Sequence, residues 1–254
     1  MLLALDVGNT NITLGAFQGE RLLRTWRLAT DAKKTADEIG VSLKALWPAE
    51  LGQLDGAIYG SVVPELDRAI ETAVKLYLGA PATAVTYKSK LGIALKVDKP
   101  AEVGVDRILN ALAVYRLHGA PAVVVDFGTA TTFDCVSARG WYLGGAILPG
   151  PRLAARALKE HTAQLPEVAV AKPARVVGKN TVECIQAGVY YGYLGMIERV
   201  LKETLREMSP KNPKSVKVIA TGGLAGLFTT ELGSIQQVPD LTLQGLRLAH
   251  EVLE

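Results

Sequence analysis

The chain has 254 residues, of which 49% are hydrophobic and 21% are charged, and its formal net charge is +3. This composition is typical of a well-packed globular protein with one large domain or two of ordinary size. The small charge provides no basic stripe, so we expect no nucleic-acid partner, and no apolar run reaches the ~20 residues of a membrane span, so we expect no membrane association.

The cysteines and the N-terminal residues predict a cytoplasmic protein. The chain has two cysteines, Cys135 and Cys184, with no CxxC motif, which favours a reduced compartment. The N-terminus lacks the basic region and cleavage site of a signal peptide, and its apolar start is typical of a strand. The three histidines are far apart in sequence and show no zinc-binding spacing.

The first apolar run reaches an acid, turns, and returns as an alternating strand. Gly8 permits backbone angles that a side chain would forbid, and the amide and hydroxyl groups beside it can direct several donors at one anion. An acid at the carboxyl end of a strand, next to such a turn, suits a phosphate with its Mg²⁺; an ordinary hairpin with one polar end is the alternative. The segment comprises Asp6, Val7, Gly8, Asn9, Thr10, Asn11, Ile12 and Thr13.

Periodicity and turn residues then predict the elements of the first half. A capping box, Thr35 with Glu38, starts a helix that extends to about residue 47. A His-Gly-Ala-Pro sequence at 118–121 ends the last helix, and we place a domain boundary there, giving domains 1–118 and 119–254. The other predicted elements are strands at 13–17, 22–29, 56–62 and 93–97 and helices at 65–78 and 102–117.

The second half opens by repeating the plan of the first. Residues 122–136 again run from an apolar strand through an acid, Asp126, to a turn with Gly128 and Thr129, and into a second strand. This repeat suggests two similar half-domains whose turns face each other across a cleft. Two acids and two donor-rich turns there would hold a nucleotide polyphosphate and its cation.

The remaining elements follow in order. The pair Asn180–Thr181 caps a long helix at 182–208, in which Gly188, Gly192 and Gly195 indicate close packing against another helix or a subunit. A strand at 216–220 ends in Thr-Gly-Gly before a helix, which is a third turn suited to anions. We also predict a strand at 141–148 and helices at 152–159 and 241–253.

One polar segment interrupts an otherwise apolar helical pattern: Gly104, Val105, Asp106 and Arg107. In a functional reading, Asp106 is the general base for a substrate hydroxyl and Arg107 holds a substrate carboxylate by two hydrogen bonds. The residues alone favour the other interpretation, a solvated helix face with an ion pair to a neighbour.

Taken together, these motifs resemble those of the type III pantothenate kinase family, within the acetate and sugar kinase/Hsp70/actin superfamily. The resemblance extends over essentially the whole chain, and its specificity lies in the joint order and spacing of the motifs. The matching segments are residues 6–11, 104–107, 126–132, 143–150, 180–183, 186–188 and 221–223.

The resemblance implies an α/β fold of two ribonuclease-H-like domains, each a mixed five-stranded sheet flanked by helices, with a central cleft. It implies transfer of the ATP γ-phosphoryl group to the primary hydroxyl of pantothenate, the first step toward coenzyme A. Two rivals stay open: a kinase of the same superfamily with another hydroxylated substrate, and a non-enzymatic regulator like the related Bvg accessory factor.

The resemblance also implies residue roles. The segment from Asp6 to Thr13 would hold the ATP phosphates, with Asp6 near Mg²⁺ and Thr129 as a further ATP contact. Asp106 would be the catalytic base, Asp126 the ligand of a monovalent cation (potassium or ammonium). The implied pantothenate contacts are Gly104, Val105 where the family usually has Ala, Asp106, Arg107 on the carboxylate, Val97 where the family often has Tyr, and Thr181 across a homodimer interface.

Overall fold

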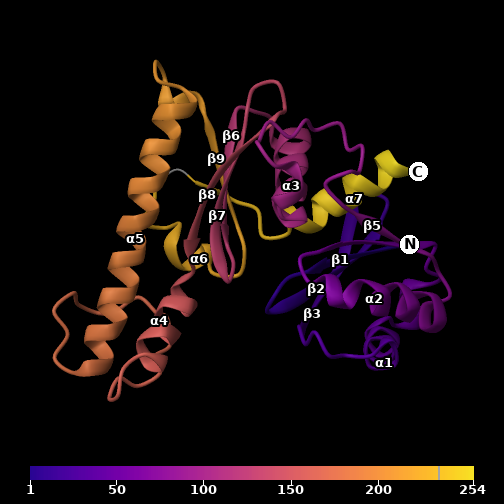
Figure 1. The fold of residues 1–254 in the computed structure, drawn as a ribbon, viewed down its shortest axis with the longest axis horizontal. Coiled ribbons are helices and arrows are strands. Elements are labelled where there is room, and N and C mark those ends of the chain that lie inside the picture. The colour runs from indigo at the N-terminus through magenta and orange to yellow at the C-terminus, as the bar shows by residue number, and fades with distance from the viewer. Residues whose placement is uncertain (234) are drawn as a thin grey trace. The chain divides into compact units, whose positions relative to one another are not determined.

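In the computed structural model, which describes residues 1–233 and 235–254, the chain forms two compact units. The first unit comprises residues 1–116 and 241–254, and the second comprises residues 117–240. Each unit contains one five-stranded sheet with helices packed on it (Figure 1). Among the described residues, no helix is both long and apolar enough to cross a membrane.

The sheet of the first unit has the strand order β3-β2-β1-β4-β5. The central strand β1 pairs antiparallel with β2 and parallel with β4, so the sheet is mixed. Its strands are β1 (Leu2–Val7), β2 (Asn11–Gln18), β3 (Arg21–Ala29), β4 (Gly56–Ser61) and β5 (Ala82–Val85). Its helices are α1 (Ala36–Leu46), α2 (Asp67–Ala73), α3 (Val105–Ala113) and α7 (Leu241–Leu253).

The alternation of side chains along β1 explains how this sheet is covered. Leu3, Leu5 and Val7 belong to the buried cluster that includes residues of α1 and α2. Because successive strand residues point to opposite faces, the even-numbered positions, which end with Asp6, face the other side of the sheet. Asp6 therefore shares that side of the sheet with the two helices that pack there, α7, which contacts β1, β2 and β4, and α3, which contacts β4.

The second unit repeats the topology of the first. Its sheet has the order β10-β9-β6-β7-β8, with β6 antiparallel to β7 and parallel to β9. The strands are β6 (Ala122–Phe127), β7 (Ala130–Val136), β8 (Tyr142–Pro149), β9 (Lys217–Thr221) and β10 (Gln236–Gln237), and the helices are α4 (Pro151–Glu160), α5 (Thr181–Met208) and α6 (Ala225–Phe228). The predicted pair of mixed five-stranded sheets flanked by helices is confirmed.

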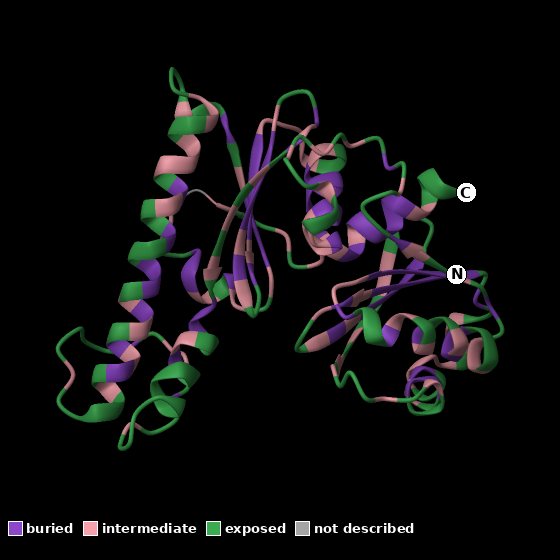
Figure 2. Ribbon diagram, in the orientation of Figure 1, coloured by how far each residue is buried: buried purple, intermediate pink, exposed green. Residues whose placement is uncertain are grey.

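Aromatic side chains fill the space between this second sheet and α5. The rings of Tyr193 and Phe228 have centroids 4.6 Å apart, and those of Phe127 and Phe228 stack at 6.0 Å. The central strands and the sheet-facing side of α5 are buried (Figure 2). The large buried aromatic area fixes one end of β6, where Phe127 directly follows Asp126.

Two predicted elements are wrong in detail. Residues 93–97 form no strand: only Leu95 makes an isolated bridge, in the loop that precedes α3. The fifth strand of the sheet is instead β5, a short Ala-Thr-Ala-Val segment whose small residues give little strand signal. The helix predicted at 65–78 contains α2 but ends in a π-helical turn at Val74–Leu78.

The second predicted domain, 119–254, differs from the observed division in its last helix. Helix α7 packs in the first unit, where Thr242 donates a hydrogen bond to Asn110 at 2.8 Å. Gly245 allows this close approach, because a Cβ atom there would lie 2.3 Å from the backbone oxygen of Leu109. An apolar helix face can cover either sheet, and nothing in the local sequence specifies which.

Candidate active site

The turn between β1 and β2 is held by its own backbone. The N–H of Gly8 donates to the oxygen of Asn11 at 3.0 Å, and the Thr30 hydroxyl donates to the oxygen of Gly8 at 2.6 Å. Val7 and Ile12 pair across the strands and are 1% and 3% exposed. Their side chains belong to the core, so only their backbone groups can contribute to a nucleotide site.

The side chains of Asn9 and Thr10 are exposed at the tip of this turn, whereas those of Asp6, Asn11 and Thr13 are partly buried. The tip thus places the Asn9 amide and the Thr10 hydroxyl at the surface, a few residues after Asp6. A fixed backbone gives these polar groups a defined direction, and their use for a phosphate stays a prediction.

The helix α3 begins on the same face of the sheet as Asp6. Asp6 lies opposite Gly60 in the parallel β1–β4 pair, so their side-chain positions share one face. A Cβ atom at Gly60 would lie 2.8 Å from Leu109 Cδ1 and 3.2 Å from Val105 Cγ1. The absence of a side chain at Gly60 therefore lets the first turns of α3 pack beside Asp6, a role that the sequence signals only as a glycine within a strand.

Asp106 lies in the first turn of α3, after the N-cap residue Gly104. Its Oδ1 accepts a hydrogen bond from the backbone N–H of Arg107 at 2.9 Å. Burial raises the pKa of Asp106, and the Arg107 N–H and the Arg107 charge oppose that rise. The side chain is thus a partly buried carboxyl group in the first turn of α3, and its burial favours the neutral form.

In the second unit, Asp126 ends a central strand beside a glycine turn. It pairs with Thr221 of β9, and the next residue, Gly222, has a φ of +89°. A Cβ atom at Gly222 would lie 2.5 Å from Asp126 Oδ1 and 2.7 Å from the backbone N and C of Phe127. The turn after β9 therefore packs directly on Asp126, and the helix α6 that follows has only four residues.

A buried tyrosine lies behind Asp126. Burial raises the pKa of Tyr193 to about 12, the Thr131 hydroxyl that contacts the phenol opposes the rise, and the charge of Asp126 adds to it. Tyr193 therefore stays neutral at physiological pH, and it anchors α5 to the strand that follows the Asp126 turn.

The exposed residue Thr129 lies in the turn that links β6 to β7, as predicted. Its backbone oxygen accepts a hydrogen bond from Gly150 N at 3.1 Å, and Gly150 is the N-cap of α4. A Cβ atom at Gly150 would lie 2.3 Å from that oxygen. The start of α4 thus fixes the backbone of the Thr129 turn.

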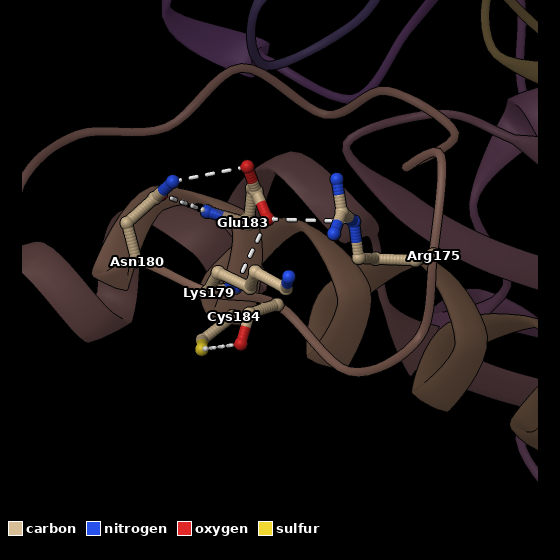
Figure 3. A network of polar contacts seen from close by, with 6 residues as sticks. Arg175, Lys179, Asn180, Glu183 and Cys184 are labelled. Atoms are coloured by element: carbon tan, nitrogen blue, oxygen red, sulfur yellow. Dashed lines mark hydrogen bonds and ion pairs between the residues drawn. The ribbon is translucent and has the colours of Figure 1, made fainter.

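A polar network lies at the start of α5 (Figure 3). Thr181 is the exposed first residue of this helix. Asn180 caps the helix by accepting a hydrogen bond from Glu183 N at 2.9 Å, and its amide donates back to Glu183 Oε1 at 3.0 Å. Glu183 also accepts from the backbone N–H of Lys179 at 3.0 Å and lies 3.9 Å from Arg175 Nε. The network ties the preceding segment to the first turn of α5.

The structure brings some of the predicted site residues together and separates others. Gly60, the strand neighbour of Asp6, packs against Val105 at the start of α3, and Val97 lies partly buried in the loop between β5 and α3. Thr181 is remote from Asp126, because at ~1.5 Å per residue it lies about 18 Å along α5 from Tyr193. Within the described residues, no three metal-ligating side chains form a metal-binding group.

A duplicated mixed five-stranded sheet, with an acid and a glycine-containing turn at the end of each central strand, defines the fold class: an α/β protein of two ribonuclease-H-like units. The chain belongs to the type III pantothenate kinase family, whose model matches residues 2–203. Relatives named type III pantothenate kinase include one from Moorella thermoacetica, 47% identical over 99% of both chains, and one from Streptomyces avermitilis, 46% identical over 99% of this chain and 98% of that one.

Solved structures agree with this fold at low sequence identity. A Campylobacter jejuni protein described as a Baf family transcriptional activator matches with a TM-score of 0.61 at 19% identity, over 98% of this chain and 97% of the other. A ROK family glucokinase from Streptomyces griseus, in complex with glucose and AMPPNP, matches with a TM-score of 0.50 at 15% identity, over 98% of both chains. These likenesses concern the fold alone.

Proposed function

We propose that this protein transfers the γ-phosphoryl group of ATP to the primary hydroxyl of pantothenate, giving 4′-phosphopantothenate for coenzyme A synthesis. Membership of the type III pantothenate kinase family supports this substrate. The observation that carries the proposal is the position of Asp106, a desolvated carboxyl group at the start of α3, on the same sheet face as Asp6. One turn thus holds the phosphates and the neighbouring helix start receives the acceptor alcohol.

The mechanism assigns a task to each group. The Asp6–Thr13 turn holds the ATP phosphates, Thr129 adds a contact to ATP, and Arg107 binds the pantothenate carboxylate. Asp106 takes the hydroxyl proton while the alcohol oxygen bonds to the γ-phosphorus and the bond to the β-phosphate oxygen breaks, releasing ADP. Most of the acceleration in such transfers comes from positioning and charge neutralisation, which these residues supply.

The residues present fit a metal that arrives with the nucleotide. Mg²⁺ is usually held by one or two carboxylates together with phosphate oxygens and water, and Asp6 provides one carboxylate beside the phosphate turn. When bound, the ion neutralises charge on the transferred phosphoryl group. Asp126, beside the turn that follows β9, provides a carboxylate that would hold potassium or ammonium.

Arg107→Ala should weaken pantothenate binding by about 1.5–3 kcal/mol, the usual contribution of a hydrogen bond to a charged group. The KM for ATP should stay close to that of wild type, because Arg107 is assigned to the acceptor. Pantothenol, which lacks the carboxylate, is the matched substrate: its KM should change little in the variant. An equal loss for pantothenate and pantothenol would assign Arg107 another role.

Asp126→Ala should abolish the difference in activity between potassium and sodium buffers. The wild-type protein should be faster in potassium, since the carboxylate holds the monovalent cation. The measurement is the rate of ADP release in potassium and in sodium buffers of the same ionic strength. Asp134 is buried, so its replacement would not be a suitable control. Glu160→Gln, at the exposed end of α4, is the control and should keep the potassium response. A potassium response that survives in Asp126→Ala would contradict the assignment.

We also propose a homodimer in which α5 of each subunit packs against the other subunit. Gly188, Gly192 and Gly195 are exposed along α5, and a Cβ atom at any of them would meet nothing within 4 Å in the same chain. Thr181 belongs to the same stripe of the helix and lies far from Asp126 of its own chain. A partner subunit would bury this stripe and bring Thr181 to a pantothenate site.

Gly192→Lys should halve the mass measured by light scattering after size exclusion. A lysine has room in the separate subunit and improves helix propensity by up to ~1 kcal/mol, so the fold should persist, but two backbones could no longer approach at this point. Glu207→Lys, which adds the same side chain at an exposed position near the end of α5, is the control and should keep the dimer. A Gly192→Lys protein of unchanged mass would rule out this interface.

A coupled assay of ADP release tests the function itself. Release that depends on pantothenate, in the presence of Mg²⁺ and potassium, is the expected result. Release with a sugar but not with pantothenate would favour another kinase of the same fold. DNA binding at physiological salt without any ADP release would favour a regulator.

A further inference from the structure

The carboxylate of Asp106 lies over the α-carbon of Gly104, which precedes it by two residues. A Cβ atom built on Gly104 would lie 2.5 Å from Asp106 Oδ1 and 3.6 Å from its Cγ, and the next neighbour, Val62 Cγ1, would be 3.7 Å away. Real Cβ atoms do not come within 3.0 Å of an oxygen, so a methyl group and the observed carboxylate exclude each other. The space over Gly104 is occupied by one oxygen of the Asp106 carboxylate.

The backbone of Gly104 does not require glycine. Its φ of −57° and ψ of 136° lie in the extended region that any residue adopts. N-cap positions usually carry Ser, Thr, Asp or Asn, whose side chains satisfy the first N–H groups of the helix, and Gly104 supplies no such cap. Neither conformation nor capping therefore explains this glycine, which leaves the contact with Asp106.

We propose that Gly104 is a positioning residue that fixes the orientation of the Asp106 carboxylate by leaving open the space that Oδ1 occupies. This inference rests on the proposed role of Asp106 as the base. Oδ1 is held between the Gly104 α-carbon and the N–H of Arg107, so the second oxygen has a defined direction toward the acceptor hydroxyl. A methyl group at residue 104 would rotate the carboxylate away from this direction.

The contact predicts damage to catalysis but not to folding. The atom that must move is the end of a short side chain, whose rotation costs the fold little. The same rotation moves the reactive oxygen, and a displacement of ~1 Å can lower the rate of an oriented reaction by about 10²-fold. Gly60 and Gly245 differ in this respect, since their Cβ atoms would meet core side chains or backbone.

The experiment compares Gly104→Ala with Gly56→Ala in the full-length protein. Gly56 is buried in β4 of the same unit, and a Cβ atom there would meet only His250 Cε1, at 3.8 Å. Gly104→Ala should lower kcat by roughly 10–100-fold with the KM for ATP and the Tm near wild type. Gly56→Ala should keep wild-type kcat, and a wild-type kcat in Gly104→Ala would overturn the inference.

A double-mutant cycle with Asp106→Asn separates this inference from the proposed function. If Gly104 acts through the carboxylate, adding Gly104→Ala to Asp106→Asn should not lower kcat further. An additive loss would show that Gly104 acts elsewhere and would overturn the inference. The inference would also be overturned if Gly104→Ala lowered the Tm and the double variant with Asp106→Ala had the same low Tm. Wild-type kcat in Asp106→Asn alone would instead refute the assignment of Asp106 as the base.

Discussion

Asp106→Asn should lower kcat by about 10²–10⁴-fold, the range that general acid–base groups contribute. Asparagine has nearly the same shape but cannot accept the hydroxyl proton, so the geometry of α3 should persist while the proton has no acceptor. ATP binding should stay near that of wild type, because the phosphate turn follows β1 and lies outside α3. The measurements are steady-state kinetics and the Kd for a non-hydrolysable ATP analogue.

The pKa of Asp106 adds a pH dependence with a definite sign. Burial raises this pKa above its ordinary value, and only the deprotonated form can act as a base. The activity should therefore rise with pH through the raised pKa, at a pH higher than an ordinary aspartate would give. In Asp106→Asn, the residual activity should no longer fall at low pH. An unchanged fall at low pH, or an unchanged kcat, would contradict the assignment.

The same raised pKa has a consequence for stability. The folded state binds the Asp106 proton more tightly than the unfolded state, so this group's contribution to stability is present at low pH and is lost as the pH rises through the folded-state pKa. At neutral pH the charged carboxylate is a destabilising group. Asp106→Asn should thus be as stable as wild type or more stable at neutral pH, as is common for catalytic groups.

Gly222→Ala should destabilise the second unit by about 2–5 kcal/mol, adding the strain of a positive φ to the overpacking of a filled space. Its φ is +89°, and the added methyl group would lie 2.7 Å from the backbone N and C of Phe127. Unlike the carboxylate over Gly104, a strand backbone cannot rotate away. The response of activity to potassium should fall as well, because the methyl group would also displace Asp126.

Gly226→Ala provides the matched control for this change. Gly226 lies in α6, four residues further on, and a Cβ atom there would be 3.8 Å from its nearest neighbour, Gln237 Oε1. Urea unfolding should show a loss for Gly222→Ala and little change for Gly226→Ala. Equal stability of the two variants would mean that the turn after β9 can move away from Asp126.

The repeated part of the fold could be predicted from the sequence because its signals are local. Each half has an apolar strand, an acid, a glycine turn and a second strand, and β1, β2, β6 and β7 appear where these patterns occur. The capping box at Thr35 and Glu38 likewise starts α1 as expected. Alternation and capping act over a few residues, so a single sequence is sufficient to detect them.

The parts that could not be predicted depend on contacts between distant segments. The strand β5 is a short edge strand that pairs in parallel with β4, and parallel pairing leaves no turn motif to detect. The residues 93–97 have an apolar composition but find no partner strand. The assignment of α7 to the first unit likewise follows from its packing on α3 and on Gly15. A Cβ atom added to Gly15 would lie 3.0 Å from Cδ1 of Leu243, a residue of α7.

The candidate site shows the same division. The sequence motifs located the acids and the turns, and the resemblance supplied their roles. It did not show that the Val7 and Ile12 side chains lie in the core, or that Gly60, Gly104 and Gly222 leave space for particular neighbours. Those properties depend on contacts between distant segments. The sequence shows where a glycine is, but not which atom of another segment packs against it.

The return of α7 to the first unit bears on how the protein forms during translation. The second unit, residues 117–240, is continuous and can fold as soon as it leaves the ribosome. The first unit is made earlier but lacks α7, which contacts α3, β1 and β4 and is synthesised only after the second unit. Of the two units, the one whose synthesis begins first is therefore completed second, because its framework is whole only after α7 has left the ribosome.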